Sequence, residues 1–162
     1  MKPLSEQEIV RREKLQKLRE LGIDPYPAKT FEINTNSKKI NENFEEEKKV
    51  FIAGRIMSRR IQGKASFAEL QDNFGKVQLY FNRDEICIGE DKTKYNEIYK
   101  KLLDIGDIIG VKGEVFVTKV GEISVLVKSF KLLSKSIKPK KVINIFKICI
   151  LIYIEIFIIL IF

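Results

Sequence analysis

Five short segments in which apolar and polar residues alternate constrain the fold of this 162-residue chain more than any other feature. Successive side chains of a strand point to opposite faces of a sheet, so this alternation predicts strands that bury one face. Turn-forming residues stand between them, at Gly63, residues 72–75 and Gly121, and a helical spacing of apolar residues covers residues 93–103. The predicted strands are residues 50–59, 65–71, 76–81, 108–118 and 123–133.

Three strands, a helix and two further strands follow the order of the OB-fold, a five-stranded Greek-key barrel. We therefore predict a β-rich (α+β) fold with this barrel over residues 50–134. Residues 1–49 are expected to hold an N-terminal helix and a polar connection, with a short helix near residues 40–47. A capping-box pattern begins the first helix at Ser5, and Gly22 predicts its end in a Schellman arrangement.

Charge and missing residue types exclude several functions. The chain has 30 basic and 22 acidic residues, a net charge of +8, which favours an anionic partner such as RNA, DNA or a lipid surface. It contains no histidine, which removes the Ser-His-Asp triad and the usual zinc sites. Its two cysteines, Cys87 and Cys149, are far apart and lack metal-ligand spacing, so they predict a reduced, cytosolic setting.

One aromatic residue of the second predicted strand lies on the polar side of that strand. Leu70 assigns one face to the core, and Phe67 falls on the other face together with Glu69. An aromatic ring beside basic residues on a solvent-facing sheet is what stacking on a nucleic-acid base requires. A hydrophobic cap at one end of the barrel is the alternative role for Phe67.

Three polar residues join Phe67 as candidates for an interface. The alternation places Gln78 opposite the apolar side of the third strand, and Glu122 with Ser124 opposite the apolar side of the fifth. The simpler interpretations are an outward strand residue for Gln78 and a turn residue for Glu122. Arg60 belongs to an arginine pair before the first turn; it is either a base contact or a surface charge, and the alternation alone does not separate it from Arg59.

Four longer stretches occur in an order and spacing that point to a known family. They read RREKLQKLRELGIDPYP (11–27), AGRIMSRRIQGKASFAELQD (53–72), KVQLYF (76–81) and DIGDIIGVKGEVFVTKVGEISV (104–125). Together they resemble the N-terminal anticodon-binding domain of bacterial class II lysyl-tRNA synthetases, the lysine–tRNA ligases. The resemblance covers residues 5–139.

The resemblance implies a partner and a site. In that family the barrel binds a U-rich anticodon, and Phe67 corresponds to the ring that stacks on the central uridine. Arg60, Gln78 and Glu122 correspond to the polar residues beside that base. Uracil presents one N–H between two carbonyls, so arginine can donate, glutamate can accept and glutamine can do either. A tRNA anticodon loop is therefore the expected partner, and the resemblance also allows a homodimer.

Full-length members of the family use ATP and magnesium to attach lysine to tRNA in the cytoplasm. No stretch after Pro139 resembles their catalytic domain, so we expect no cofactor, no metal and no catalytic residue in this chain. The sequence predicts a truncated or frameshifted product that is inactive alone. A ligase assembled from separately encoded halves is the alternative.

Residues 135–162 form a tail that is first basic and then rich in isoleucine; the resemblance stops after Pro139, and the isoleucine-rich part is unrelated to the family. Residues 143–162 include ten isoleucines, a composition that a frameshift in an AT-rich gene would produce. A stretch of roughly 20 apolar residues is also long enough to span a bilayer. The second hypothesis is therefore a tail-anchored membrane protein with a cytosolic OB domain, in which residues 135–147 face anionic lipid.

Overall fold

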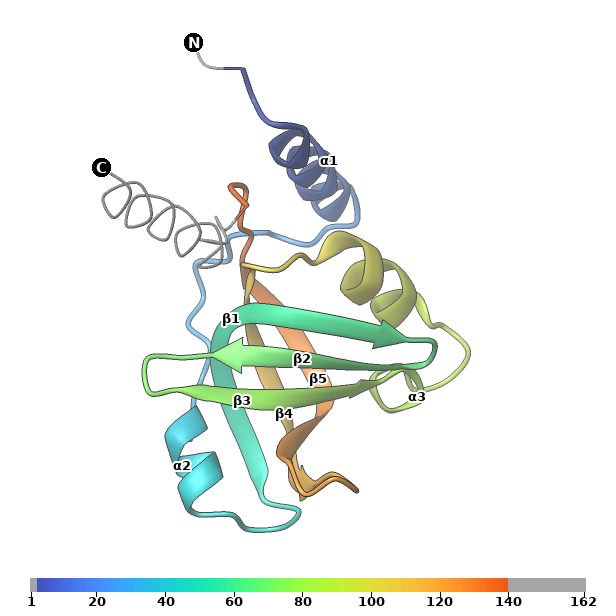
Figure 1. Ribbon diagram of the computed structural model, residues 1–162. Coiled ribbons are helices and arrows are strands. Elements are labelled where there is room, and N and C mark those ends of the chain that lie inside the picture. Colours follow the sequence, from blue (N-terminus) through green and yellow to red (C-terminus); the bar gives the residue numbers. More distant parts are fainter. Residues whose placement is uncertain (1–2, 140–162) are drawn as a thin grey trace, which may run out of the picture.

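The computed structural model describes residues 3–139, and five strands in this range close into a barrel (Figure 1). The order around the barrel is β1-β2-β3-β5-β4, and β4 returns to pair with β1. Neighbouring strands are antiparallel except β3 and β5, which run parallel. This topology confirms the predicted OB-fold. The strands are β1 (Lys49–Gln62), β2 (Ala65–Gln71), β3 (Lys76–Asn82), β4 (Ile108–Val117) and β5 (Ile123–Ser134).

Alternate residues of the strands fill the barrel interior, as the sequence pattern predicted. Leu70 and Leu79 on the neighbouring strands β2 and β3 are fully buried. The long strand β1 pairs with β4 along its first half and with β2 along its second half. Beside this change of partner lies Gly54, where a Cβ atom would lie 2.5 Å from the carbonyl oxygen of Gln71 on β2. Glycine at this position therefore lets one strand serve both sides of the barrel.

A π-helix, η1 (Lys94–Leu102), stands where the sequence predicted a helix over residues 93–103. It lies between β3 and β4 in the chain and packs its buried face onto the barrel core. The rings of Phe81 and Tyr99 stack with centroids 4.1 Å apart, and Tyr95 is fully buried. This apolar contact fixes η1 to the barrel.

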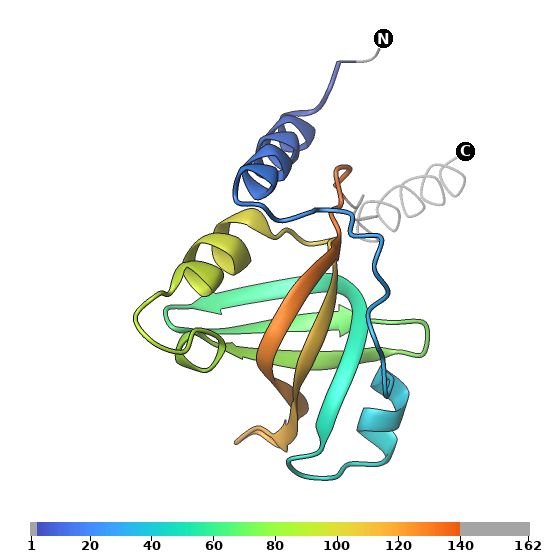
Figure 2. The same ribbon diagram turned by 180° about the vertical axis from the view of Figure 1, so that it is seen from behind.

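The N-terminal helix α1 (Glu6–Glu20) lies on η1, on the side away from the barrel (Figures 1 and 2). Its predicted ends are confirmed. Ser5 and Glu8 form a reciprocal capping box. At the other end, Gly22 has φ 71°, and the Ile23 amide donates to the Leu18 carbonyl over 2.9 Å, which is the Schellman geometry. Leu18 is fully buried.

Two short helices differ from the prediction. The helix α2 (Ser37–Glu42) begins earlier than the expected residues 40–47, because the Asn36 side chain caps it by accepting from the Lys39 amide over 2.9 Å. The helix α3 (Arg83–Ile86) was not predicted, since four residues are too few to show a helical spacing. Neither helix changes the order of the barrel strands.

The carboxylate of Asp72, in the turn between β2 and β3, gives the fold a pH-dependent stability. It accepts hydrogen bonds from Ser37 Oγ at 2.6 Å, from the Ser37 amide at 2.7 Å, and from the amides of Phe74 and Gly75. Partial burial alone would raise the pKa of Asp72, but these hydrogen bonds outweigh it, and the pKa is lowered. The stabilisation is therefore present above the unfolded pKa of about 3.9 and is lost as the pH falls through the lowered value.

We expect Asp72→Asn to lower the free energy of unfolding at pH 7 by about 1 kcal/mol, a low value because the carboxylate is partly exposed. The difference from the parent chain should shrink as the pH falls from 5 towards 2, as measured by urea denaturation. Glu46→Gln, a change at an exposed residue in the loop before β1, is the control. A difference that stayed constant with pH would show that the charge of Asp72 is not what stabilises the turn.

Candidate nucleic-acid interface

A groove of about 690 Å³ runs over the outer face of β2 and β3 and is bordered by β1 and the β4–β5 hairpin. Five separate segments supply its walls: the consecutive strands β1, β2 and β3, the β4–β5 hairpin, and Asn41 of α2. Arg60, Phe67, Gln78 and Glu122, the four residues singled out from the sequence, all line it. The structure therefore brings the whole candidate set to one place.

The floor of the groove is aromatic on one side. Phe67 is partly buried, and its ring lies 5.0 Å from the ring of Tyr80 on the neighbouring strand. The guanidinium of Arg60 lies 5.7 Å from the centroid of the Phe67 ring. The face of the Phe67 ring with a cation beside it suits the face and the edge of a nucleotide base.

A β-bulge separates the two arginines that alternation could not distinguish. The register of β1 against β2 shifts between Ile56 and Ser58, so that Arg60 pairs with Phe67 and Arg59 pairs with the buried Ala68. The bulge reverses the facing of every later residue in β1. Arg60 therefore lies beside Phe67 at the groove.

Arg59 also borders the groove, but its side chain is bound to η1. Its Nη1 donates to the carbonyl of Tyr99 over 2.5 Å, and its Nη2 donates to the carbonyl of Lys100 over 3.4 Å. Its guanidinium carbon lies 5.5 Å from the centroid of the Tyr99 ring. These contacts give Arg59 a structural role that connects β1 to η1.

Gln78 has a fixed partner on the next strand. Its Nε2 donates to Ser124 Oγ over 2.8 Å, and Ser124 Oγ donates to the carbonyl of Glu122 over 3.3 Å. The alternation had placed Ser124 on the outer polar face, but this residue is fully buried. The larger side chains of its register partners, Gln78 on β3 and Phe116 on β4, flank it and explain the difference.

The charges of the groove are partly balanced. Glu122 is exposed in the β4–β5 hairpin, and its amide donates to Thr118 Oγ1 over 3.0 Å, which holds the hairpin in shape. On the opposite wall, Lys76 and Glu69 form an ion pair at 2.8 Å. The Glu69 charge is thus balanced within the protein, which reduces its repulsion of a phosphodiester backbone.

Phe116 was not among the residues predicted for the site, and its ring lies 5.9 Å from that of Tyr80. Phe116 is partly buried, whereas its neighbour Val115 is buried in the core. The alternation of β4 was the available signal, because it places Phe116 on the outer face. Phe67, Tyr80 and Phe116 together form a continuous aromatic surface next to the groove.

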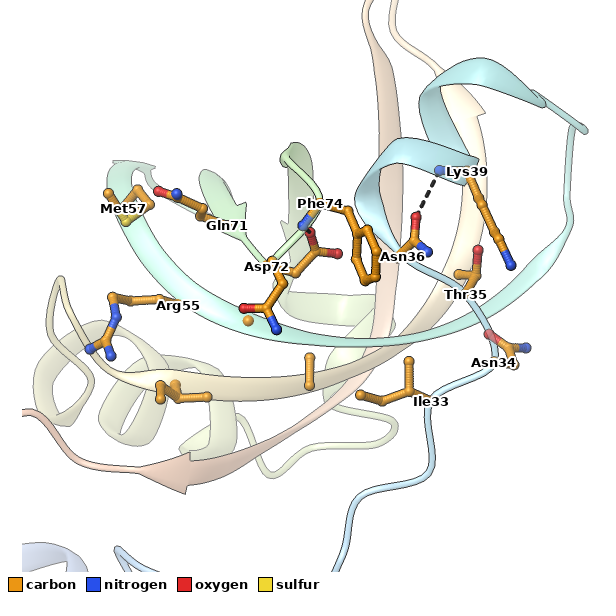
Figure 3. Close-up of a pocket in the computed structure, with 14 residues that line it drawn as sticks. Ile33, Asn34, Thr35, Asn36, Lys39, Arg55, Met57, Gln71, Asp72 and Phe74 are labelled. Carbon is orange, nitrogen blue, oxygen red and sulfur yellow. Dashed lines mark hydrogen bonds between the residues drawn. The ribbon is translucent and has the colours of Figure 1, made fainter.

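A second groove, of about 640 Å³, lies at the other end of β2 (Figure 3). It is bordered by residues 33–36, β1 and the β2–β3 turn, and it contains none of the four candidate residues. Two of the three charged residues that line it are already bound: Arg55 Nη1 donates to the carbonyl of Gly106 over 2.6 Å, and Asp72 holds the turn. We therefore place the candidate interface in the first groove.

Residues 3–139 include no group of three or more His, Cys, Asp or Glu side chains arranged to hold a metal ion. In the same range, no helix has the length and apolarity needed to cross a membrane. Residues 143–162, on which both interpretations of the tail depend, lie outside the described residues. Lys135, which the membrane hypothesis expected to face lipid, is buried, and its Nζ contacts Asp104 and Asp107.

The closed five-stranded barrel and its outer groove define an OB-fold domain of the nucleic-acid-binding class. Residues 50–133 match the family described as OB-fold nucleic acid binding domain (tRNA_anti-codon), and the chain belongs to this family. The curated relatives that match the chain include lysine–tRNA ligases. This agrees with the resemblance found in the sequence, and the matching part is their anticodon-binding OB domain.

Three of these relatives show the extent of the similarity. The chain is 65% identical over 139 residues to the lysine–tRNA ligase of Christiangramia forsetii, covering 86% of this chain and 24% of the relative. It is 57% identical over 146 residues to that of Porphyromonas gingivalis, covering 87% and 25%. It is 52% identical over 136 residues to that of a Thermoanaerobacter species, covering 82% and 26%. The chain thus spans about a quarter of the length of these relatives.

Proposed function

We propose that the groove binds the anticodon loop of a tRNA with a U-rich anticodon, and that the central uridine stacks on Phe67. The observation that carries this proposal is the convergence of Arg60, Phe67, Gln78 and Glu122 from separate segments on one groove. An unpaired base held in this way presents its face to a ring and its edge to polar side chains, which is how proteins recognise single-stranded RNA loops.

The polar groups of the groove suit the edge of uracil. Arg60 is a donor for a carbonyl oxygen of the base, and its planar guanidinium is always charged. The oxygens of Gln78 and Glu122 are acceptors, one for the N–H of the base and the other for a ribose hydroxyl. This combination of donors and acceptors is complementary to an edge that alternates acceptor, donor and acceptor.

Selection of a tRNA would serve a reaction, and we propose that reaction for a protein longer than this chain. The relatives are named lysine–tRNA ligases, and the chain matches about a quarter of each. We propose that the groove selects the tRNA for ATP-dependent and magnesium-dependent attachment of lysine. Homodimerisation and a cytoplasmic location, which the resemblance implies, belong to the same proposal.

The binding proposal is tested with a labelled 17-nucleotide anticodon stem-loop whose anticodon is UUU, titrated with the full chain and followed by fluorescence anisotropy. The comparison RNA has the same stem and the anticodon AAA. We expect preference for UUU and an affinity that falls steeply with salt, because basic side chains contact the backbone. Equal binding of the two RNAs would contradict the proposal.

The arginine pair provides a matched prediction in the same assay. Arg60→Gln should weaken binding of the UUU stem-loop by about 1 kcal/mol, because an exposed cation that contacts the base is lost. Arg59→Gln should lower the melting temperature instead and leave the affinity of the folded protein within about twofold, because Arg59 is bound to η1. Equal losses of RNA affinity in the two variants would show that the bulge does not decide which arginine contacts RNA.

A further inference from the structure

We infer that Ser124 is a positioning residue that fixes the amide of Gln78 with its oxygen towards the groove, so that the site favours uracil over cytosine. The inference rests on the proposed binding of an anticodon loop and adds to it the residue that sets the base preference. Ser124 lies on β5 and is the register partner of Gln78 on the parallel strand β3.

The orientation of the Gln78 amide follows from the hydrogen bonds of one hydroxyl group. The Ser124 hydroxyl has a single proton, and it donates this proton to the Glu122 carbonyl at 3.3 Å. The Ser124 oxygen is then free to accept from the NH₂ group of Gln78 over 2.8 Å, and this is the orientation of the amide in the structure. Gln78 Oε1 then points away from Ser124.

Burial makes this arrangement selective. Ser124 is fully buried, so water cannot replace its hydroxyl as the partner of the amide. The side of Gln78 away from Ser124 faces β2, where Glu69 is its register partner. Glu69 is paired with Lys76 at 2.8 Å, and Gln78 Oε1 is thus the neutral acceptor offered to a base in the groove.

Such an acceptor distinguishes the two pyrimidines at the middle position of their pairing edges. Uracil presents an N–H there and can donate to Gln78 Oε1. Cytosine presents an unprotonated nitrogen, which is an acceptor, and two acceptors in contact repel. If the amide were free to turn, its NH₂ group would satisfy cytosine equally well, and the preference would be lost.

The test uses the full chain and two stem-loops, with anticodons UUU and UCU, and its readout is the ratio of the two dissociation constants. Ser124→Ala should reduce the preference for UUU by roughly threefold to tenfold, the effect of one hydrogen bond. Ser124→Thr keeps the hydroxyl and should retain the preference. The change Ser124→Ala should have no further effect on the ratio in a Gln78→Ala background, because Ser124 acts through Gln78.

Ser66→Ala is the matched control. Ser66 is also a fully buried strand serine, but its Oγ pairs with the Tyr95 hydroxyl at 2.6 Å inside the barrel. Ser66→Ala should lower the melting temperature without changing the ratio. An unchanged ratio in Ser124→Ala, beside a parent chain that prefers UUU, would overturn the inference alone. A parent chain with no preference for UUU, and no loss of affinity on Phe67→Ala, would overturn the proposed function itself.

Discussion

Lys135→Ala should destabilise the domain by about 3–5 kcal/mol, because the change leaves the buried carboxylate of Asp107 without its cation. The side chain of Lys135 is fully buried, and its Nζ lies 2.6 Å from Asp104 Oδ2 and 2.7 Å from Asp107 Oδ2. It also donates to the carbonyl of Leu102 over 2.8 Å. Removing one partner of a buried ion pair lowers the free energy of unfolding by more than the pair itself contributes to it, because the remaining charge cannot reach water.

The loss of stability should also affect neighbouring elements, because the two carboxylates connect several of them. Asp104 also pairs with Lys14 of α1 at 2.6 Å, and Asp107 Oδ1 accepts from the Ser136 amide over 2.8 Å. Burial alone would raise the pKa of Asp104, but Lys135 and Lys14 outweigh it and the pKa is lowered. This stabilisation is complete above the unfolded pKa of about 3.9 and is lost as the pH falls through the lowered value.

Urea denaturation at pH 7 measures the effect, and Lys128→Ala is the control. Lys128 also makes two ion pairs, with Glu85 at 2.6 Å and Glu114 at 3.5 Å, but its side chain is 40% exposed. Exposed pairs of this kind contribute at most about 1 kcal/mol, so Lys128→Ala should have a small effect. Similar losses in the two variants would show that burial is not what makes the Lys135 cluster important.

The sequence did not reveal the role of Lys135, and the reason is distance along the chain. Its carboxylate partners Asp104 and Asp107 lie 31 and 28 residues earlier, and a lysine followed by more lysines has the composition of a basic tail. The alternation of apolar and polar residues predicted correctly which side chains are buried where the local sequence decides this. In β2, for example, both the limits of the strand and its buried face were predicted correctly. The alternation placed Ser124 on the correct outer face but did not predict its burial, and it left the arginine pair undecided. The first depends on the size of neighbours across the sheet, and the second on a bulge.

Two kinds of information combined to give the candidate site. Alternation placed Phe67, Gln78 and Glu122 on outer faces, while the family resemblance selected Arg60 from its pair. Neither shows how far apart these residues lie, because the strand order and register decide that. The barrel closes with β5 beside β3, which carries the hairpin of Glu122 to the same groove as Gln78.

Phe67→Ala should weaken binding of the UUU stem-loop by about 1–3 kcal/mol, the range measured for loss of one base-stacking ring. Phe67 borders the groove, and the ring of Tyr80 supports it at 5.0 Å; the proposal places the RNA base on the other side of the Phe67 ring. Alanine removes the surface on which the base lies, whereas Phe67→Trp keeps an aromatic face and should retain most of the affinity. Fluorescence anisotropy at fixed salt gives the dissociation constants.

Phe74→Ala is the control, because it removes an exposed phenylalanine that lies outside the candidate groove. Phe74 is 63% exposed in the β2–β3 turn and borders the second groove, so an RNA that bound any exposed aromatic ring would lose affinity with this variant too. We expect Phe74→Ala to bind UUU as the parent chain does. The melting temperature of each variant separates a lost contact from a lost fold. A folded Phe67→Ala variant with the affinity of the parent chain would remove the central step of the proposed function, because Arg60, Gln78 and Glu122 would then have no stacked base to contact.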